Sequence, residues 1–198
     1  MDTDSIFARL REGDAGALEE LVRQHQARAL RTAYLITGDR SLAEDVVQEA
    51  FLRVYAKADQ FDVRRPFEPW FLRIVSNDAL KAAAARGRMA SLDETKGSMP
   101  SLAELLPAPV PGPDRQAEIQ EMRASLWAAV CRLSPAQRAV VVQRYYLGLT
   151  EREAASQGGR AAGTVKHLLH RARERLRSLL GAEGIVAERA ARDEEDAR

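Results

Sequence analysis

The sequence predicts an all-α protein with two small helical domains, a proline-rich linker between them, and a helix-turn-helix in the C-terminal domain. Three observations support this fold class. Ala, Leu, Arg and Glu dominate the composition, and these residues favour helices. Runs in which Val, Ile, Thr and Tyr alternate with polar residues, as half-buried strands require, are missing. Five of the eight prolines lie between residues 88 and 114, where we expect the linker.

Three helices are predicted in the N-terminal half. The first covers residues 14–36 and begins at an aspartate that suits an N-cap. The second covers residues 41–57 and opens with Ser41 and Glu44 spaced as a capping box. The third covers residues 70–86 and carries apolar residues at helical spacing. These three segments are expected to form one helical domain.

The C-terminal half predicts one helix after residue 114 and then a helix-turn-helix. Ser134 and Gln137 form a capping box around a proline at the first helical position, and Thr150 and Glu153 form another. Two glycines mark a tight turn, and a long basic helix follows. Two helices joined by such a turn, the second of them basic, are typical of a helix-turn-helix, whose second helix lies in the major groove of DNA.

The charge of the chain is small but unevenly distributed. Formal net charge is only +1, whereas a protein that binds DNA unaided usually carries a larger basic excess. Residues 160–177 carry a local charge of +5, and residues 183–198 carry −3. A basic patch with an acidic remainder favours a DNA-binding subunit that also docks on a protein.

Several function classes lack support in the sequence. The single cysteine, Cys131, excludes an internal disulfide and a cysteine metal cluster, and the three histidines lack acidic partners at ligand spacing. No glycine-rich phosphate loop or nucleophile elbow is found. We therefore expect no enzyme activity, catalytic residue, metal or cofactor. Without a long apolar run or a signal peptide, we expect a cytoplasmic protein with no membrane insertion.

Three segments carry a resemblance to a known family: AEDVVQEAFLRVY (43–55), FEPWFLRIVSN (67–77) and LSPAQR…GTVKHLLHRARERL (133–176). Together they resemble the extracytoplasmic-function (group 4) sigma factors of bacterial RNA polymerase, in the right order and over roughly residues 10–178. The resemblance implies a specificity subunit that binds core polymerase, recognises promoter DNA and helps to melt it. It divides the chain into sigma region 2 (1–88), a flexible linker (89–114), sigma region 4 (115–180) and a charged tail (181–198).

For region 2, the resemblance implies two tasks. The helix that begins at Ser41 would dock on the clamp helices of the largest polymerase subunit, with the flap region as a further polymerase contact. Its acidic strip would face that coiled coil through Asp45, Gln48 and Glu49. The loop 61–66 and the helix after it would capture a flipped base of the minus-ten element and contact nearby phosphates. The residues expected there are Phe61, Arg64, Arg65, Arg73, Asn77 and Lys81.

An unstacked base needs an aromatic or apolar wall and hydrogen-bonding groups at its edge. Phe61 is the residue expected to supply that wall, and Asn77 is expected to supply the edge contact. The neighbouring aromatic residues Phe67, Trp70 and Phe71 are interpreted as core residues instead.

For region 4, the resemblance implies recognition of the minus-thirty-five element by the helix that begins near Ala162. Arginine can read guanine bidentately, and lysine can reach phosphate or guanine. The residues expected to contact DNA are Arg160, Thr164, Lys166, His167, His170 and Arg171. The chain departs from the family pattern at Gly158, Arg160, Ala161 and Ala162, so a looser turn and a different use of Arg160 are alternatives.

The sequence leaves an alternative to the sigma factor open. A stand-alone helix-turn-helix regulator would bind operator DNA as a dimer on palindromic half-sites. The low net charge and the 67–77 segment favour the sigma factor. The family also allows an anti-sigma factor as a partner, which the sequence does not identify.

Overall fold

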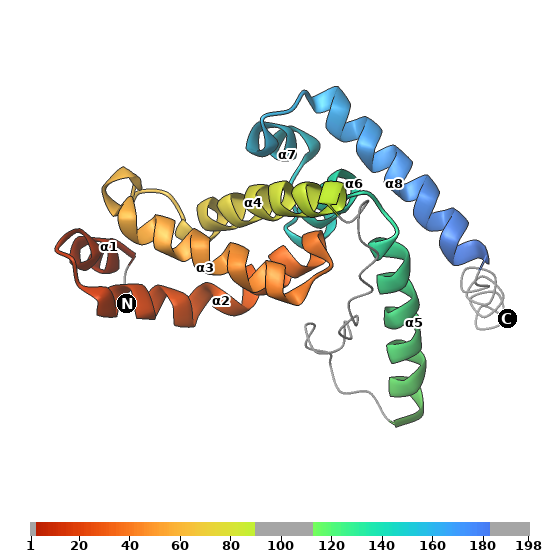
Figure 1. Cartoon of the computed structure of the whole chain (residues 1–198), viewed down its shortest axis with the longest axis horizontal. Coiled ribbons are helices and arrows are strands. Elements are labelled where there is room, and N and C mark those ends of the chain that lie inside the picture. Colours follow the sequence, from red (N-terminus) through yellow and green to blue (C-terminus); the bar gives the residue numbers. More distant parts are fainter. Residues whose placement is uncertain (1–2, 90–112, 183–198) are drawn as a thin grey trace, which may run out of the picture. The chain divides into compact units, whose positions relative to one another are not determined.

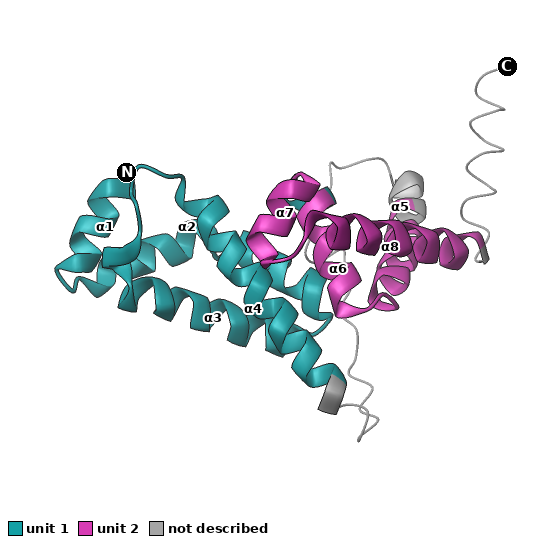
Figure 2. Ribbon diagram, turned by 90° about the horizontal axis from the view of Figure 1, so that it is seen from above, with its two compact units in different colours: residues 1–97, 145–148 teal, residues 98–144, 149–198 magenta. Residues whose placement is uncertain are grey.

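The structure is a computed structural model that describes residues 3–89 and 113–182 (Figure 1). Those residues form helices joined by short connections, with no strand among them, which confirms the all-α prediction. The chain divides into two compact units (Figure 2). Unit 1 comprises Met1–Gly97 with Tyr145–Gly148, and unit 2 comprises Ser98–Arg144 with Leu149–Arg198.

Unit 1 is built on three long helices that pack against one another (Figure 1). They are α2 (Ala15–Thr37), α3 (Arg40–Ala56) and α4 (Phe67–Met89). A short helix α1 (Thr3–Arg11), which the sequence analysis missed, packs on α2 and on the 3-10 turn η1 (Ala58–Gln60). The loop from Phe61 to Pro66 connects η1 to α4.

The core of unit 1 is rich in aromatic rings. Phe67 and Phe71 are buried, as expected, and their rings stack with centroids 5.2 Å apart. Phe51 from α3 lies 4.4 Å from Phe71, and Phe7 from α1 lies 5.6 Å from Phe67. Trp70 is only partly buried. Four separate segments of the chain therefore meet in one ring cluster, the aromatic cluster, which we define as Phe7, Phe51, Phe61, Phe67, Trp70 and Phe71.

Two helix caps in unit 1 were expected from the sequence, and one of them is wrong. The third predicted helix, 70–86, begins at Phe67 instead. The Asp14 side chain accepts a hydrogen bond from the Gly16 amide (2.8 Å), which confirms it as the N-cap of α2. The capping box at Ser41 is not formed. Instead Asp39 is the N-cap of α3 and accepts from the Leu42 amide at 2.8 Å. α2 ends at a left-handed glycine immediately before Asp39, so the carboxylate reaches the first free amides before Ser41 does.

Unit 2 holds the helix-turn-helix. Its elements are α5 (Pro113–Cys131), α6 (Pro135–Val141), α7 (Glu151–Gly158) and α8 (Ala162–Ala182). The π-helix η3 (Val142–Tyr146) begins in unit 2, and its last two residues are assigned to unit 1. Both capping boxes, Ser134 with Gln137 and Thr150 with Glu153, are present. α8 packs against α5, α6 and α7, and the buried cluster between α6, α7 and α8 consists of Val140, Ala154, Ala155, Val165 and Leu169.

Most of the expected linker (89–114) and of the expected charged tail (181–198) lies outside the described residues. Within the described part of the chain, no helix is long and apolar enough to cross a membrane.

Candidate functional site

The outward face of α3 carries the acidic strip expected from the sequence. Asp45, Gln48 and Glu49 are all exposed. The reason is helical geometry: the residues of α3 that point into unit 1 are Val46, Val47, Ala50, Phe51 and Val54, so positions 45, 48 and 49 fall on the other side. The strip thus presents two carboxylates and an amide within two turns.

Leu52 shares this face and was missed. Its side chain is 54% exposed, although single exposed leucines are common on protein surfaces. It follows Gln48 by four residues and Glu49 by three, so it lies next to both on the helix. The signal in the sequence was a leucine out of phase with the buried positions of α3. We call Asp45, Gln48, Glu49 and Leu52 the α3 face.

The loop between η1 and α4 presents two arginines held by one carboxylate. Asp62 accepts from Arg64 at 2.9 Å and lies 3.6 Å from Arg65. The hydrogen bond from the Arg64 side chain is the main cause that lowers the pKa of Asp62. Both guanidinium groups stay largely exposed, so they remain accessible to a phosphate. Asp62 was not singled out from the sequence, yet it sets where these cations lie.

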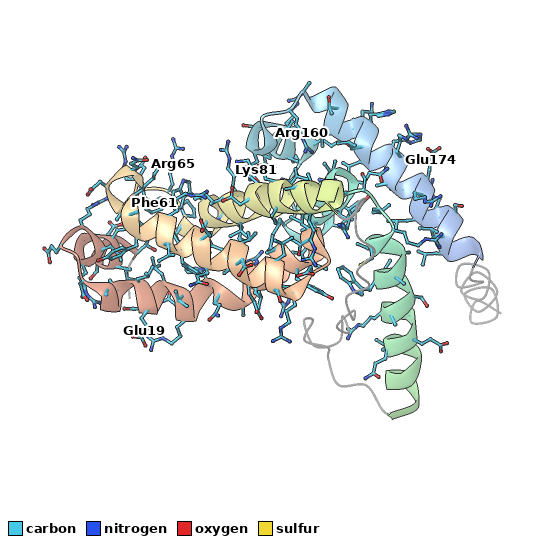
Figure 3. All side chains as sticks on the ribbon, in the orientation of Figure 1. Glu19, Phe61, Arg65, Lys81, Arg160 and Glu174 are labelled. Atoms are coloured by element: carbon cyan, nitrogen blue, oxygen red, sulfur yellow. The ribbon has the colours of Figure 1, made fainter. Side chains whose placement is uncertain are left out.

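The expectation that Phe61 offers an open aromatic wall is wrong for this structure. Its side chain is 3% exposed. Its ring lies 4.4 Å from Phe7 and 4.8 Å from Trp70, centroid to centroid. α1, which the sequence analysis did not foresee, supplies the ring that covers it. Phe61 therefore anchors the loop in the aromatic cluster, and Arg65 extends outward from that loop (Figure 3).

Along α4, the expected contact residues differ in exposure. Arg73 and Lys81 are exposed, and Asn77 is half-buried. Lys81 lies 3.6 Å from Asp78, which also binds Arg53 of α3 at 2.5 Å. Figure 3 shows Lys81 projecting from the same side of unit 1 as Arg65. Asp78, which the sequence analysis overlooked, therefore draws two cations to the junction of α3 and α4.

In α8, the expected contact residues are on the surface. Thr164, Lys166, His167, His170 and Arg171 are exposed, whereas Val165 and Leu169 are buried. At about 100° per residue, Lys166 and Arg171 are separated by about 140° around the helix axis, so they flank the outward face from opposite sides. His170 lies 3.3 Å from Glu174, which projects away from α8 in Figure 3.

Arg160 lies in the turn before α8 rather than on it. It is half-buried, and its aliphatic carbons lie 3.7 Å from the point where a side chain on Gly158 would begin. Gly159 adopts a φ of 61°, in the left-handed region that favours glycine. The aliphatic part of Arg160 therefore lies beside Gly158 at a distance that would be ordinary van der Waals contact for a side chain there.

Two family models match the chain. The one described as Sigma-70 region 2 matches residues 21–89, and the one described as Sigma-70, region 4 matches residues 123–176. The first falls on α2 to α4 of unit 1. The second falls on the end of α5 and the helix-turn-helix of unit 2. α1 precedes both matched segments.

Individual relatives agree with these matches. The chain is 35% identical to the ECF RNA polymerase sigma factor SigE of Mycolicibacterium smegmatis over 85% of its own length and 64% of that protein. It is 32% identical to the RNA polymerase sigma-E factor of Streptomyces coelicolor, over 93% of this chain and 97% of that one.

Among solved structures, the sigma factor RpoE in complex with the anti-sigma factor NepR from Bartonella quintana matches with a TM-score of 0.59. That match has 26% identity and covers 82% of this chain and 96% of the other. Both sigma-70 regions are thus matched in this chain, region 2 ahead of region 4. The chain therefore belongs to the extracytoplasmic-function group of sigma-70 RNA polymerase sigma factors and directs promoter-specific transcription.

Proposed function

We propose that this chain binds core RNA polymerase through the α3 face and carries it to promoters that its two units read separately. Unit 1 would read and open the minus-ten element, and unit 2 would read the minus-thirty-five element. The functional boundaries that we assign are 1–88, a linker over 89–114, 115–180, and a tail over 181–198. The observation that carries the proposal is the pairing of an exposed acidic face on α3 with an exposed basic helix α8 in one chain.

The α3 face fits a basic helical partner on the polymerase, which we propose to be the clamp helices of its largest subunit, with the flap region as a second contact. Asp45 and Glu49 would pair with cations, and Gln48 would donate or accept hydrogen bonds. Leu52 would add apolar contact at the end of the strip, where desolvation strengthens the neighbouring charge pairs. Exposed charges alone contribute little, so the apolar contact matters for affinity.

At the minus-ten element, we propose that the loop and α4 act together. Arg64, Arg65, Arg73 and Lys81 would contact phosphates of the opened strand, and Asn77 would contact a base edge. The buried Phe61 would hold the loop in place, rather than stack on the base. Asp62 and Asp78 would weaken phosphate binding by the nearby cationic side chains, because the two carboxylates compete with phosphate for the same cations.

At the minus-thirty-five element, we propose that α8 enters the major groove with Arg171 reading bases and Lys166 contacting phosphate. His167 and His170 would lie on the groove-facing side, Thr164 would bind backbone phosphate near the start of the helix, and Arg160 would contact phosphate from the turn. We propose that the chain acts without catalysis or cofactor, in the cytoplasm, and that an anti-sigma factor controls it, since a structural relative is bound to one.

The test of the core-binding face is a pull-down with purified core polymerase, followed by run-off transcription on a genomic promoter library. Asp45→Lys/Glu49→Lys should abolish an approximately equimolar complex, because the new lysines would repel a basic partner. The matched control is Glu12→Lys/Glu19→Lys, which makes the same charge change at exposed positions outside α3. Equal affinity of both double variants would overturn the assignment. Dimers on palindromic sites without polymerase would favour the stand-alone regulator instead.

A further inference from the structure

We propose that Arg11, at the end of α1, is a positioning residue for the minus-ten loop. This inference rests on the proposed function of unit 1. It concerns a helix that precedes the matched sigma-70 region 2, and it assigns to that helix control over how the loop presents itself to an unpaired base.

The Arg11 guanidinium reaches the start of the loop directly. Its Nη2 donates a hydrogen bond to the backbone oxygen of Phe61 at 3.2 Å, and its Nε lies 3.7 Å from an Asp59 carboxylate oxygen. The two contacts fall on η1 and on the first residue of the loop. A planar guanidinium can hold two acceptors in a fixed relation, so it restrains the peptide that leads into Asp62.

A second set of contacts ties α1 to the same loop. The Phe7 ring is fully buried and lies 4.4 Å from the Phe61 ring, closer than Phe67 or Trp70 does. The Tyr55 hydroxyl, near the end of α3, donates to the Gly13 backbone oxygen at 3.2 Å, in the turn that follows α1. α1 and its following turn thus contact the chain on both sides of η1.

α1 is itself fixed at the opposite side. Arg9 lies 2.7 Å from Asp14, the N-cap of α2, and 3.5 Å from Glu20, which is buried. Ile6, Phe7 and Leu10 are also buried. α1 is therefore held in place by these ion pairs and buried side chains, and Arg11 extends from it to the loop as a fixed hydrogen-bond donor.

The consequence concerns geometry more than stability. The loop residues Asp62, Arg64 and Arg65 follow Phe61, and their placement depends on the direction in which the chain leaves that residue. If the Phe61 carbonyl loses its donor, the peptide after it gains freedom while the Phe61 ring stays in the aromatic cluster. Small displacements of positioning groups can cost large factors in a reaction step. We expect opening and base preference to change together.

The experiment uses full-length protein assembled with purified core polymerase. Promoter opening is followed by permanganate reactivity of thymines and by the fluorescence of 2-aminopurine, on templates that carry each base at every minus-ten position. Core affinity is measured in parallel. Arg11→Ala is compared with Arg11→Lys, which keeps a donor, and with Arg9→Ala, a matched change in α1 whose ion pairs run to Asp14 and Glu20.

We expect Arg11→Ala to slow opening of the preferred promoter by about tenfold, the effect of losing one charge-assisted hydrogen bond. It should also reduce the ratio of the opening rates on templates with preferred and with disfavoured minus-ten bases, and the affinity for core polymerase should stay unchanged. Arg11→Lys should restore part of the ratio. A purely structural residue would slow all templates by one factor, so an unchanged ratio, or identical behaviour of Arg11→Ala and Arg9→Ala, would overturn the inference.

The same data separate this inference from the proposed function. A wild-type protein that neither binds core polymerase nor opens any promoter would remove both. A wild-type protein that opens promoters selectively, with Arg11→Ala equally selective, would leave the proposed function standing and remove the role of Arg11.

Discussion

The two units bury very different cores. Unit 1 gathers rings from α1, α3, the loop 61–66 and α4 into the aromatic cluster. The buried cluster of the helix-turn-helix in unit 2 contains no ring: it consists of Val140, Ala154, Ala155, Val165 and Leu169. Trp127 of α5 is buried in unit 2 outside this cluster. Aromatic side chains bury more area per residue and interlock more specifically than alanine or valine do.

The difference shows how each unit positions the residues that we propose contact DNA. In unit 1 the loop depends on residues that are distant in sequence, since Arg11 and Phe61 are 50 residues apart. In unit 2 the starts of α6 and α7 are held by bonds between residues three apart, as in the pair of Thr150 and Glu153. The turn is held by the amides of Gly159 and Arg160, which donate to the Ala155 oxygen four and five residues away. Unit 1 should therefore respond to core substitutions and unit 2 to changes in caps and turn residues.

The largest effect should come from the aromatic cluster. We expect Phe71→Ala to lower the free energy of unfolding of unit 1 by about 3–5 kcal/mol, because its ring is fully buried and a cavity remains. Val165→Ala in unit 2 should cost only about 2 kcal/mol, since fewer methyl groups are removed. Hydrogen exchange with mass spectrometry under increasing urea reports each unit separately. Equal costs in the two units would break the comparison.

The next effect concerns DNA contacts in unit 2. Arg171→Ala should weaken binding to the best minus-thirty-five sequence by about 1–3 kcal/mol and relax preference at one position. Lys166→Ala, on the opposite flank of α8, should weaken all sequences alike and reduce the salt slope by about one. Binding across a library of minus-thirty-five variants at several salt concentrations measures both. If neither variant changes affinity or preference, promoter choice rests on unit 1 alone.

A smaller effect separates the observed cap of α3 from the expected one. Asp39→Ala should destabilise unit 1 by about 1 kcal/mol through the loss of the cap, with its ion pair to Arg86 adding to the effect. Ser41→Ala should be nearly neutral, since Ser41 is exposed in the first turn. Thr150→Ala is the counterpart in unit 2, also at about 1 kcal/mol. Thermal unfolding followed by circular dichroism tests the set, and a larger loss for Ser41→Ala than for Asp39→Ala would contradict this capping assignment.

The smallest effect is a pH dependence of unit 1 in mild acid. His25 lies against the Phe67 ring, and its burial lowers the pKa of the imidazole from 6.5, although the nearby Glu68 opposes this. The unfolded chain then binds more protons than the folded one as pH falls below 6.5, so stability present at neutral pH is lost under mild acid. His25→Gln should flatten the profile between about pH 7.5 and about pH 5.5. The exposed His167→Gln in unit 2 is the control, and identical profiles for wild type and His25→Gln would exclude the effect.

The sequence by itself determined the helical class, both capping boxes of unit 2, the start of α8 at Ala162 and the exposure of Asp45, Gln48 and Glu49. These features depend on helical periodicity and on residues three or four positions apart, so residues that are close in the sequence contain the necessary information.

Only the tertiary structure decided that Phe61 is buried and that α1 exists and closes over the loop. It also brought Asp78 to Arg53, 25 residues away in the sequence. These features depend on packing in three dimensions, because the burial of a side chain depends on which other segment of the chain packs against it. A nine-residue helix such as α1 is marginal alone and forms because Phe7 and Leu10 find a core to enter.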